Sequence, residues 1–177
     1  MKICIDPGHG GEDPGANYND VLEKKLNLDI ALKLQKLLDE VGHEIVMTRE
    51  DDIFVELYDR VKIANESSCD ILISIHSNAA GDPSAQGTET LHYPDSDQGQ
   101  KLAELVQDEL IMHLQRADRG VKARDDLAVL KGTTMPAILV ECGFISNSTE
   151  RHLLQSAGFQ HLIAESIVEA IQNYFEE

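Results

Sequence analysis

Three side chains that can bind metal ions follow apolar runs typical of buried strands. His9 comes shortly after "ICID", inside the bendable stretch "PGHGG", whereas His76 ends "ILISIH" and Glu141 ends "AILVE". In open α/β sheets the ligand site lies beyond the carboxyl ends of the strands, where the loops converge. Glu23 begins a segment with helical spacing that follows the first of these loops, so we expect all four side chains on one rim of a sheet.

These residue types suit hydrolysis assisted by a metal ion. Two imidazoles and one carboxylate are the ligand set of a catalytic zinc, which keeps a fourth position for water. A further glutamate that does not bind the metal can act as the general base. The ligands lie far apart in the chain and no H-E-x-x-H motif is present, so spacing alone only suggests such a site.

Each candidate also has a plainer interpretation. His9 could be a turn residue, and His76 a hydrogen-bonded histidine at the end of a strand. Glu23 could simply be a carboxylate favoured by the helix dipole at an N-terminus. Glu141 could belong to a buried ion pair, because a carboxylate that ends an apolar strand is costly to bury alone.

The elements that must position these residues alternate along the chain. Apolar periodicity predicts strands at residues 2–6, 43–48, 70–77, 87–93, 127–130 and 136–143. It predicts helices at residues 23–41, 54–67, 96–115, 147–156 and 159–175. Strands that alternate with long helices indicate one compact α/β domain whose sheet is covered by helices on both faces.

Composition argues against several classes of protein. The 177 residues carry a formal charge of −17, which makes binding to a nucleic-acid backbone unfavourable. No apolar run reaches the roughly 18 residues that a membrane-spanning helix needs. The first residues resemble no secretory signal peptide. Cys4, Cys69 and Cys142 show no C-x-x-C spacing, so we expect buried thiols rather than disulfides or a zinc ribbon.

Several motifs together resemble one family. "IDPGHGGEDPGA", "EKKLNLDIALKL", "SIHSNA" and "ILVECGFISN" are similar to the zinc-dependent N-acetylmuramoyl-L-alanine amidases of the amidase-3 type, which hydrolyse cell walls. The similarity extends through "TRED", "RVKIAN" and "RGVK" over nearly the whole chain. The resemblance implies one catalytic domain over residues 1–177, with a mixed, mostly parallel sheet of about six strands flanked by helices.

The same resemblance implies the site and the reaction. It assigns one zinc ion per chain to His9, Glu23 and His76, and the role of catalytic acid and base to Glu141. The bond cleaved would be the amide between N-acetylmuramic acid and the first L-alanine of the peptidoglycan stem peptide. The enzyme would work as a monomer outside the cytoplasm, on the bacterial cell wall. Because no signal peptide is seen, it would be released by lysis, as an endolysin is, or be a domain excised from a longer protein such as an autolysin.

Three other functions remain open from the sequence. A zinc carboxypeptidase acting on wall peptides would use a similar ligand set, with an added arginine for the terminal carboxylate. A cysteine amidohydrolase would use Cys142, but adjacent strand residues point to opposite faces and Glu141 already faces the site. A wall-binding module without activity would have no use for both metal ligands and a base.

Secondary positions carry weaker expectations. The segment from Arg116 to Lys131 is locally cationic, either as a solvated loop or as a binding site for stem-peptide carboxylates. Arg60 and Asn65 are expected to support the scaffold. His92 has no assigned role, and the remaining histidines are expected on surfaces or helix faces: His43, His113, His152 and His161.

Overall fold

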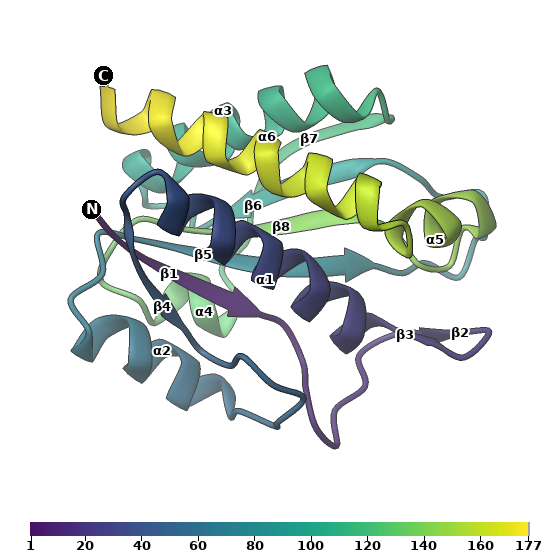
Figure 1. The fold of residues 1–177 in the computed structure, drawn as a ribbon, viewed down its shortest axis with the longest axis horizontal. Coiled ribbons are helices and arrows are strands. Elements are labelled where there is room, and N and C mark those ends of the chain that lie inside the picture. Colours follow the sequence, from purple (N-terminus) through teal and green to yellow (C-terminus); the bar gives the residue numbers. More distant parts are fainter. Residues whose placement is uncertain (177) are drawn as a thin grey trace.

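A computed structural model, which describes residues 1–176, shows an α/β domain built on a six-stranded sheet (Figure 1). The strand order is β4-β1-β5-β8-β6-β7. Their bounds are β1 (Lys2–Pro7), β4 (Glu44–Met47), β5 (Ile71–Asn78), β6 (Thr88–His92), β7 (Asp118–Ala123) and β8 (Ala137–Phe144). A separate hairpin consists of β2 (Asn17–Tyr18) and β3 (Val21–Leu22).

Six helices accompany the sheet within the described residues. They are α1 (Glu23–Glu40), α2 (Leu57–Glu66), α3 (Asp97–Leu114), α4 (Ala128–Lys131), α5 (Ser148–Leu154) and α6 (Ala157–Glu176). The helices α1, α3 and α6 lie together over one face of the sheet, whereas α2 and α4 lie on the other (Figure 1). We call these the closed face and the open face.

The strands have two unlike faces because successive side chains alternate. The closed face is apolar, and its fully buried residues include Ile3, Ile5, Ile71, Ile73, Ile75, Ile138 and Val140. On the open face, Cys4, Leu72 and Leu139 pack against α2 and α4. Further along the same strands this face becomes polar, because Asp6 pairs with Ser74 and His76 pairs with Glu141 in the sheet register.

The predicted fold class is confirmed. The strands β4, β1, β5 and β8 run parallel, while β6 is antiparallel to β8 and parallel to its other neighbour β7. The sheet is therefore mixed and mostly parallel, with six strands and with helices on both faces, as expected.

One predicted strand is wrong. Residues 127–130 were expected to be extended, but Ala128–Lys131 forms the single helical turn α4. A short apolar run does not reveal by periodicity whether it is helix or strand. The sixth strand is instead Asp118–Ala123, whose polar sequence "DRGVKA" is typical of a partly exposed edge strand and carries little apolar signal.

Two predictions from composition can be compared with the fold. All three cysteines are buried and free, as expected. Within residues 1–176, no helix combines the length and the apolar character that crossing a bilayer requires.

Candidate active site

The loop after β1 places His9 by an unusual backbone conformation. His9 has a φ of 62°, in the left-handed region that residues with a side chain seldom adopt. Gly8 precedes it for a steric reason, since a Cβ atom there would lie 2.2 Å from the His76 ring. The loop can therefore turn sharply while it passes directly against the second histidine.

Two buried arginines hold this loop in place. Arg49 donates hydrogen bonds to the carbonyl oxygens of Pro7 and Gly8, both at 2.9 Å. Arg60 donates to the carbonyl of Pro7 at 2.8 Å and to that of His9 at 2.8 Å. A strained loop persists only where its surroundings fix it, and these charged donors supply that restraint.

His9, Glu23 and His76 converge at the carboxyl ends of β1 and β5. Glu23 Oε2 lies 3.2 Å from His9 Nε2, and Glu23 Oε1 lies 3.0 Å from His76 Nδ1. One ligand atom from each of the three lies within 4.8 Å of the others. The two rings meet edge to face with their centroids 5.0 Å apart. These three predicted ligands thus lie close enough to hold a single metal ion.

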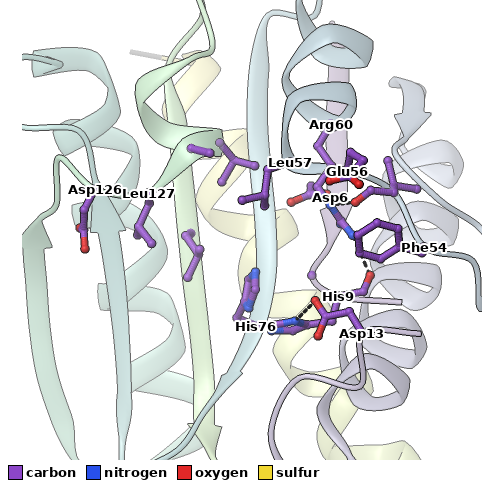
Figure 2. Close-up of a pocket in the computed structure, with 15 residues that line it drawn as sticks. Asp6, His9, Asp13, Phe54, Glu56, Leu57, Arg60, His76, Asp126 and Leu127 are labelled. Atoms are coloured by element: carbon purple, nitrogen blue, oxygen red, sulfur yellow. Dashed lines mark hydrogen bonds and ion pairs between the residues drawn. The ribbon is translucent and has the colours of Figure 1, made fainter. Parts of the chain in front are cut away.

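Further contacts fix the orientation of two of these candidate ligands, His9 and Glu23. The Asp13 carboxylate lies 2.7 Å from His9 Nδ1, an interaction that Figure 2 shows, so the opposite nitrogen Nε2 faces Glu23. The backbone amide of Ala16 and the side-chain amide of Asn27 donate to Glu23 at 2.9 and 3.2 Å. Metal-binding histidines commonly have such a carboxylate partner on the second ring nitrogen.

The electrostatics of the cluster favour positive charge between its members. Burial tends to raise the pKa of Glu23, but the two histidines outweigh it and hold that pKa far below its usual range. Burial tends to lower the pKa of His9, but Glu23 and Asp13 reverse this and raise it to about 9. The carboxylates are therefore ionised, and their negative charge favours a proton on the rings or another cation beside them.

Glu141 lies beside this cluster on the next strand. It pairs with His76 in the β5–β8 register, so both side chains project from the open face. Its Oε2 atom is buried and has no hydrogen-bond partner. Burial is the main reason that the pKa of Glu141 rises to about 7, and the charges of Glu23 and Glu89 add to it. Such a carboxyl group can exchange a proton near neutral pH.

Cys142 lies on the opposite side of β8 from its neighbour Glu141. It belongs to the apolar core of the closed face and is 1% exposed. Burial is the largest of the factors that raise the pKa of its thiol far above its usual value. A buried, protonated thiol that points away from the cleft is not a nucleophile for this site.

A cavity of about 410 Å³ opens beside the two histidines. Figure 2 shows His9, His76 and Asp13 at one end, with Phe54 and Leu57 on one side and Leu127 opposite. The walls thus come from the segment before α2 and from the segment that leads into α4, with Leu139 of β8 also lining the cavity. The cavity is large enough for part of an extended substrate and is mainly apolar away from the histidines.

The predicted cationic segment contributes to the site in an unexpected way. Arg119 and Lys122 lie on β7, where both contact the same carboxylate oxygen, Glu89 Oε2. Glu89 is buried and pairs with Glu141 in the β6–β8 register. The cations therefore neutralise a carboxylate beside the candidate base, a role that the sequence does not reveal because Glu89 reaches this position only through the pairing of β6 with β8.

The other secondary residues support the scaffold. Arg60 pairs with the buried Asp6 at 2.7 Å, and Asn65 bonds the backbone of Gly132 and Thr134, as expected of supporting residues. The His92 ring is buried, with Nδ1 2.9 Å from the carbonyl oxygen of Tyr93.

The arrangement is that of an α/β enzyme with a candidate metal centre at the carboxyl ends of its strands. Comparison with known proteins agrees: the family model described as N-acetylmuramoyl-L-alanine amidase matches residues 3–173. The chain therefore belongs to the N-acetylmuramoyl-L-alanine amidase family. The resemblance seen in the sequence is confirmed, and peptidoglycan amidase activity is supported over the carboxypeptidase alternative.

Individual relatives are similar over almost the whole chain. The germination-specific N-acetylmuramoyl-L-alanine amidase of Bacillus subtilis (strain 168) is 34% identical over 189 residues, which cover 99% of this chain and 80% of that protein. An endolysin of Bacillus phage SPP1 is 37% identical, with 96% of this chain and 64% of the endolysin covered. The crystal structure of an N-acetylmuramoyl-L-alanine amidase from Clostridium difficile 630 superposes with a TM-score of 0.96 at 38% identity, covering 99% and 97% of the two chains.

Proposed function

We propose that this chain is a zinc-dependent amidase domain, spanning residues 1–177, that hydrolyses the amide between N-acetylmuramic acid and L-alanine in peptidoglycan. The observation that carries the proposal is the convergence of His9, Glu23 and His76. Its place of action is the bacterial cell wall, outside the cytoplasm, in keeping with the names of its relatives.

The residues present fit a zinc ion. Two imidazole nitrogens and one carboxylate oxygen are the donor types of catalytic zinc sites. Glu23 is held ionised by its neighbours, and Asp13 orients the His9 ring. Glu141 Oε2 is a buried oxygen without a hydrogen-bond partner next to this donor set. A base in that position can accept a proton from a water molecule that attacks beside the metal.

In the proposed reaction, Glu141 transfers a proton in each of two stages. When bound, zinc supplies Lewis acidity, which polarises the amide carbonyl and makes water a stronger acid. Glu141 takes the proton of the attacking water as the new C–O bond forms. It then donates that proton to the L-alanine nitrogen as the C–N bond breaks, and the second proton of the water also passes to the amine, which leaves the lactyl carboxylate and the ammonium group of L-alanine. Asp13 keeps His9 oriented throughout, while Arg49 and Arg60 hold the loop.

Metal removal is the decisive experiment. A chelator should abolish lysis of purified walls, and added zinc should restore it, because the proposed mechanism relies on the metal ion to polarise the carbonyl. His76→Ala should lose the activity irrecoverably, whereas the exposed control His161→Gln should respond to chelator and zinc as the unaltered chain does. Full lysis by metal-free protein would refute the zinc assignment.

The products distinguish amidase from peptidase. Amidase cleavage exposes one new amino terminus, on L-alanine, and leaves an intact stem peptide that mass spectrometry can identify. A carboxypeptidase would instead release single residues from the far end of the peptide while the bond to the sugar stays closed.

A further inference from the structure

A second group of ligand-type side chains lies on the outer helices. Among residues 1–176, only two groups of three such residues bring their ligand atoms within 4.8 Å of one another, and the second is Glu109, His113 and Glu169. Glu109 and His113 are one turn apart on α3, and Glu169 comes from α6, which packs alongside it (Figure 1).

The three residues meet at one nitrogen atom. His113 Nε2 lies 3.0 Å from Glu169 Oε2 and 3.3 Å from Glu109 Oε2. A ring nitrogen carries at most one proton, and here it bonds Glu169. Glu109 Oε2 is consequently a buried carboxylate oxygen that accepts no hydrogen bond, although it faces the same point.

The geometry of Glu109 is fixed by a further contact. Its other oxygen, Oε1, accepts a hydrogen bond at 3.1 Å from the side-chain amide of Asn173, one turn beyond Glu169 on α6. Glu109 is also the most enclosed of the three, with a side chain 15% exposed against 30% for His113 and 51% for Glu169. The carboxylate is thus held at Oε1, whereas Oε2 faces the imidazole nitrogen at 3.3 Å without accepting a hydrogen bond.

We propose that Glu109, His113 and Glu169 form a second cation site, which takes zinc or a similar borderline divalent ion. One imidazole and two carboxylates suit such an ion, and a divalent cation would balance the two negative charges that a neutral imidazole leaves. The ion would satisfy Glu109 Oε2 directly. Because Glu169 is exposed, the remaining coordination positions of the ion would be open to water.

The proposed site would act on stability rather than on catalysis. It joins α3 to α6, the last helix, and both cover the closed face of the sheet. The candidate active site lies elsewhere, at the carboxyl ends of β1 and β5. An ion that binds only the folded state, where it joins two helices, stabilises that state by mass action.

Metal stoichiometry and thermal unfolding test the site together. The intact chain, stripped of metal and dialysed against zinc alone, should retain two zinc ions, whereas His113→Gln and Glu169→Gln should retain one. With free zinc at a hundredfold of its dissociation constant, the unaltered chain should gain roughly 5–10 °C in Tm from this site, and both variants should lose that gain. Wall lysis at saturating zinc should stay within about twofold, because neither residue lies near the active site.

Two further variants separate the possibilities. His161→Gln is the matched control, since His161 has the same spacing from Glu165, at 3.2 Å, but belongs to no three-residue group. It should retain two zinc ions, and His76→Ala should retain one together with the His113-dependent gain in Tm. A single zinc in the intact chain, lost in His76→Ala and kept in His113→Gln, would overturn the second site. If His76→Ala instead kept full activity, the proposed function would fail while the second site stood.

Discussion

The two faces of the sheet contribute differently to stability and to the candidate site. On the closed face, strand residues such as Ile73 and Val140 are fully buried under α1, α3 and α6. On the open face, the same strands carry Ser74 and Glu141 in alternate positions, and α2 and α4 cover only the part nearer the strand starts. One strand can therefore contribute to the core and to the site at once.

The difference between the faces explains why buried carboxylates are tolerated on the open face. A carboxylate buried without a partner among the aliphatic side chains of the closed face would cost several kcal/mol, on the order of the total stability of a domain. On the open face, Asp6 is buried but accepts hydrogen bonds from Thr48, Ser74 and Arg60. Glu141 Oε2 accepts no hydrogen bond, which is consistent with the proposed role of this residue as the base.

The largest effect is expected from adjacent residues on β8. Glu141→Gln keeps the side-chain volume but removes the proton acceptor, so the rate of wall lysis should fall by roughly 10²–10⁴ while zinc remains bound. Cys142→Ala on the closed face should leave the rate per folded molecule unchanged and lower the free energy of unfolding by about 1 kcal/mol.

Kinetics on soluble muropeptides and urea unfolding of both variants check this contrast. A Glu141 variant with more than half of the normal rate would place the base elsewhere. A Cys142 variant that lost most of its rate per folded molecule would show that the two faces are not independent.

A smaller loss of activity is expected from a substitution in the loop after β1, at the point where Gly8 lies against His76. Gly8→Ala would place a Cβ 2.2 Å from the His76 ring, so His76 or the loop must shift. A misplacement of about 1 Å in an active site can cost on the order of 10² in rate, and zinc affinity should fall with it. Gly81→Ala is the matched control, because a Cβ there meets nothing within 4 Å. Equal activity of the two variants would mean that the loop yields without disturbing His76.

The sequence could predict the fold and the candidate site where the signal is local. Strands buried on both sides show as apolar runs, and a ligand-type residue at the end of each run is visible without a structure. His9, His76 and Glu141 were found in this way. The structure brings these residues together with Glu23, and their roles remain proposals.

What the sequence could not predict depends on long-range contacts. Arg49 and Arg60 stabilise the loop by bonding backbone carbonyls more than forty residues away, which no spacing reveals. Glu89 acquires its position beside Glu141 only through the antiparallel pairing of β6 with β8. Asp13 is different, since a carboxylate four residues after a candidate ligand histidine is a signal that could have been used.

A pair of neighbours on β1 should affect stability far more than activity. Asp6→Asn leaves Arg60 buried without its counter-ion and should lower the free energy of unfolding by about 3–5 kcal/mol at pH 7. Ile5→Ala on the closed face should lower it by about 2–5 kcal/mol through the cavity it leaves. Both variants should retain the rate per folded molecule to within several fold, because neither residue touches the reacting atoms.

The pH dependence distinguishes these two losses. Burial tends to raise the pKa of Asp6, but Arg60, Thr48 and Ser74 outweigh it and hold that pKa below its usual value. The stability that Asp6 contributes is therefore fully present above its unfolded pKa of about 3.9 and is lost as the pH falls through the lower folded value. In urea unfolding at pH 7, 5, 4 and 3, the gap between the unaltered chain and Asp6→Asn should narrow below about pH 4, whereas the Ile5→Ala gap should stay constant. A gap for Asp6→Asn that stayed constant down to pH 3 would show that packing, rather than charge, accounts for the stabilising role of this residue.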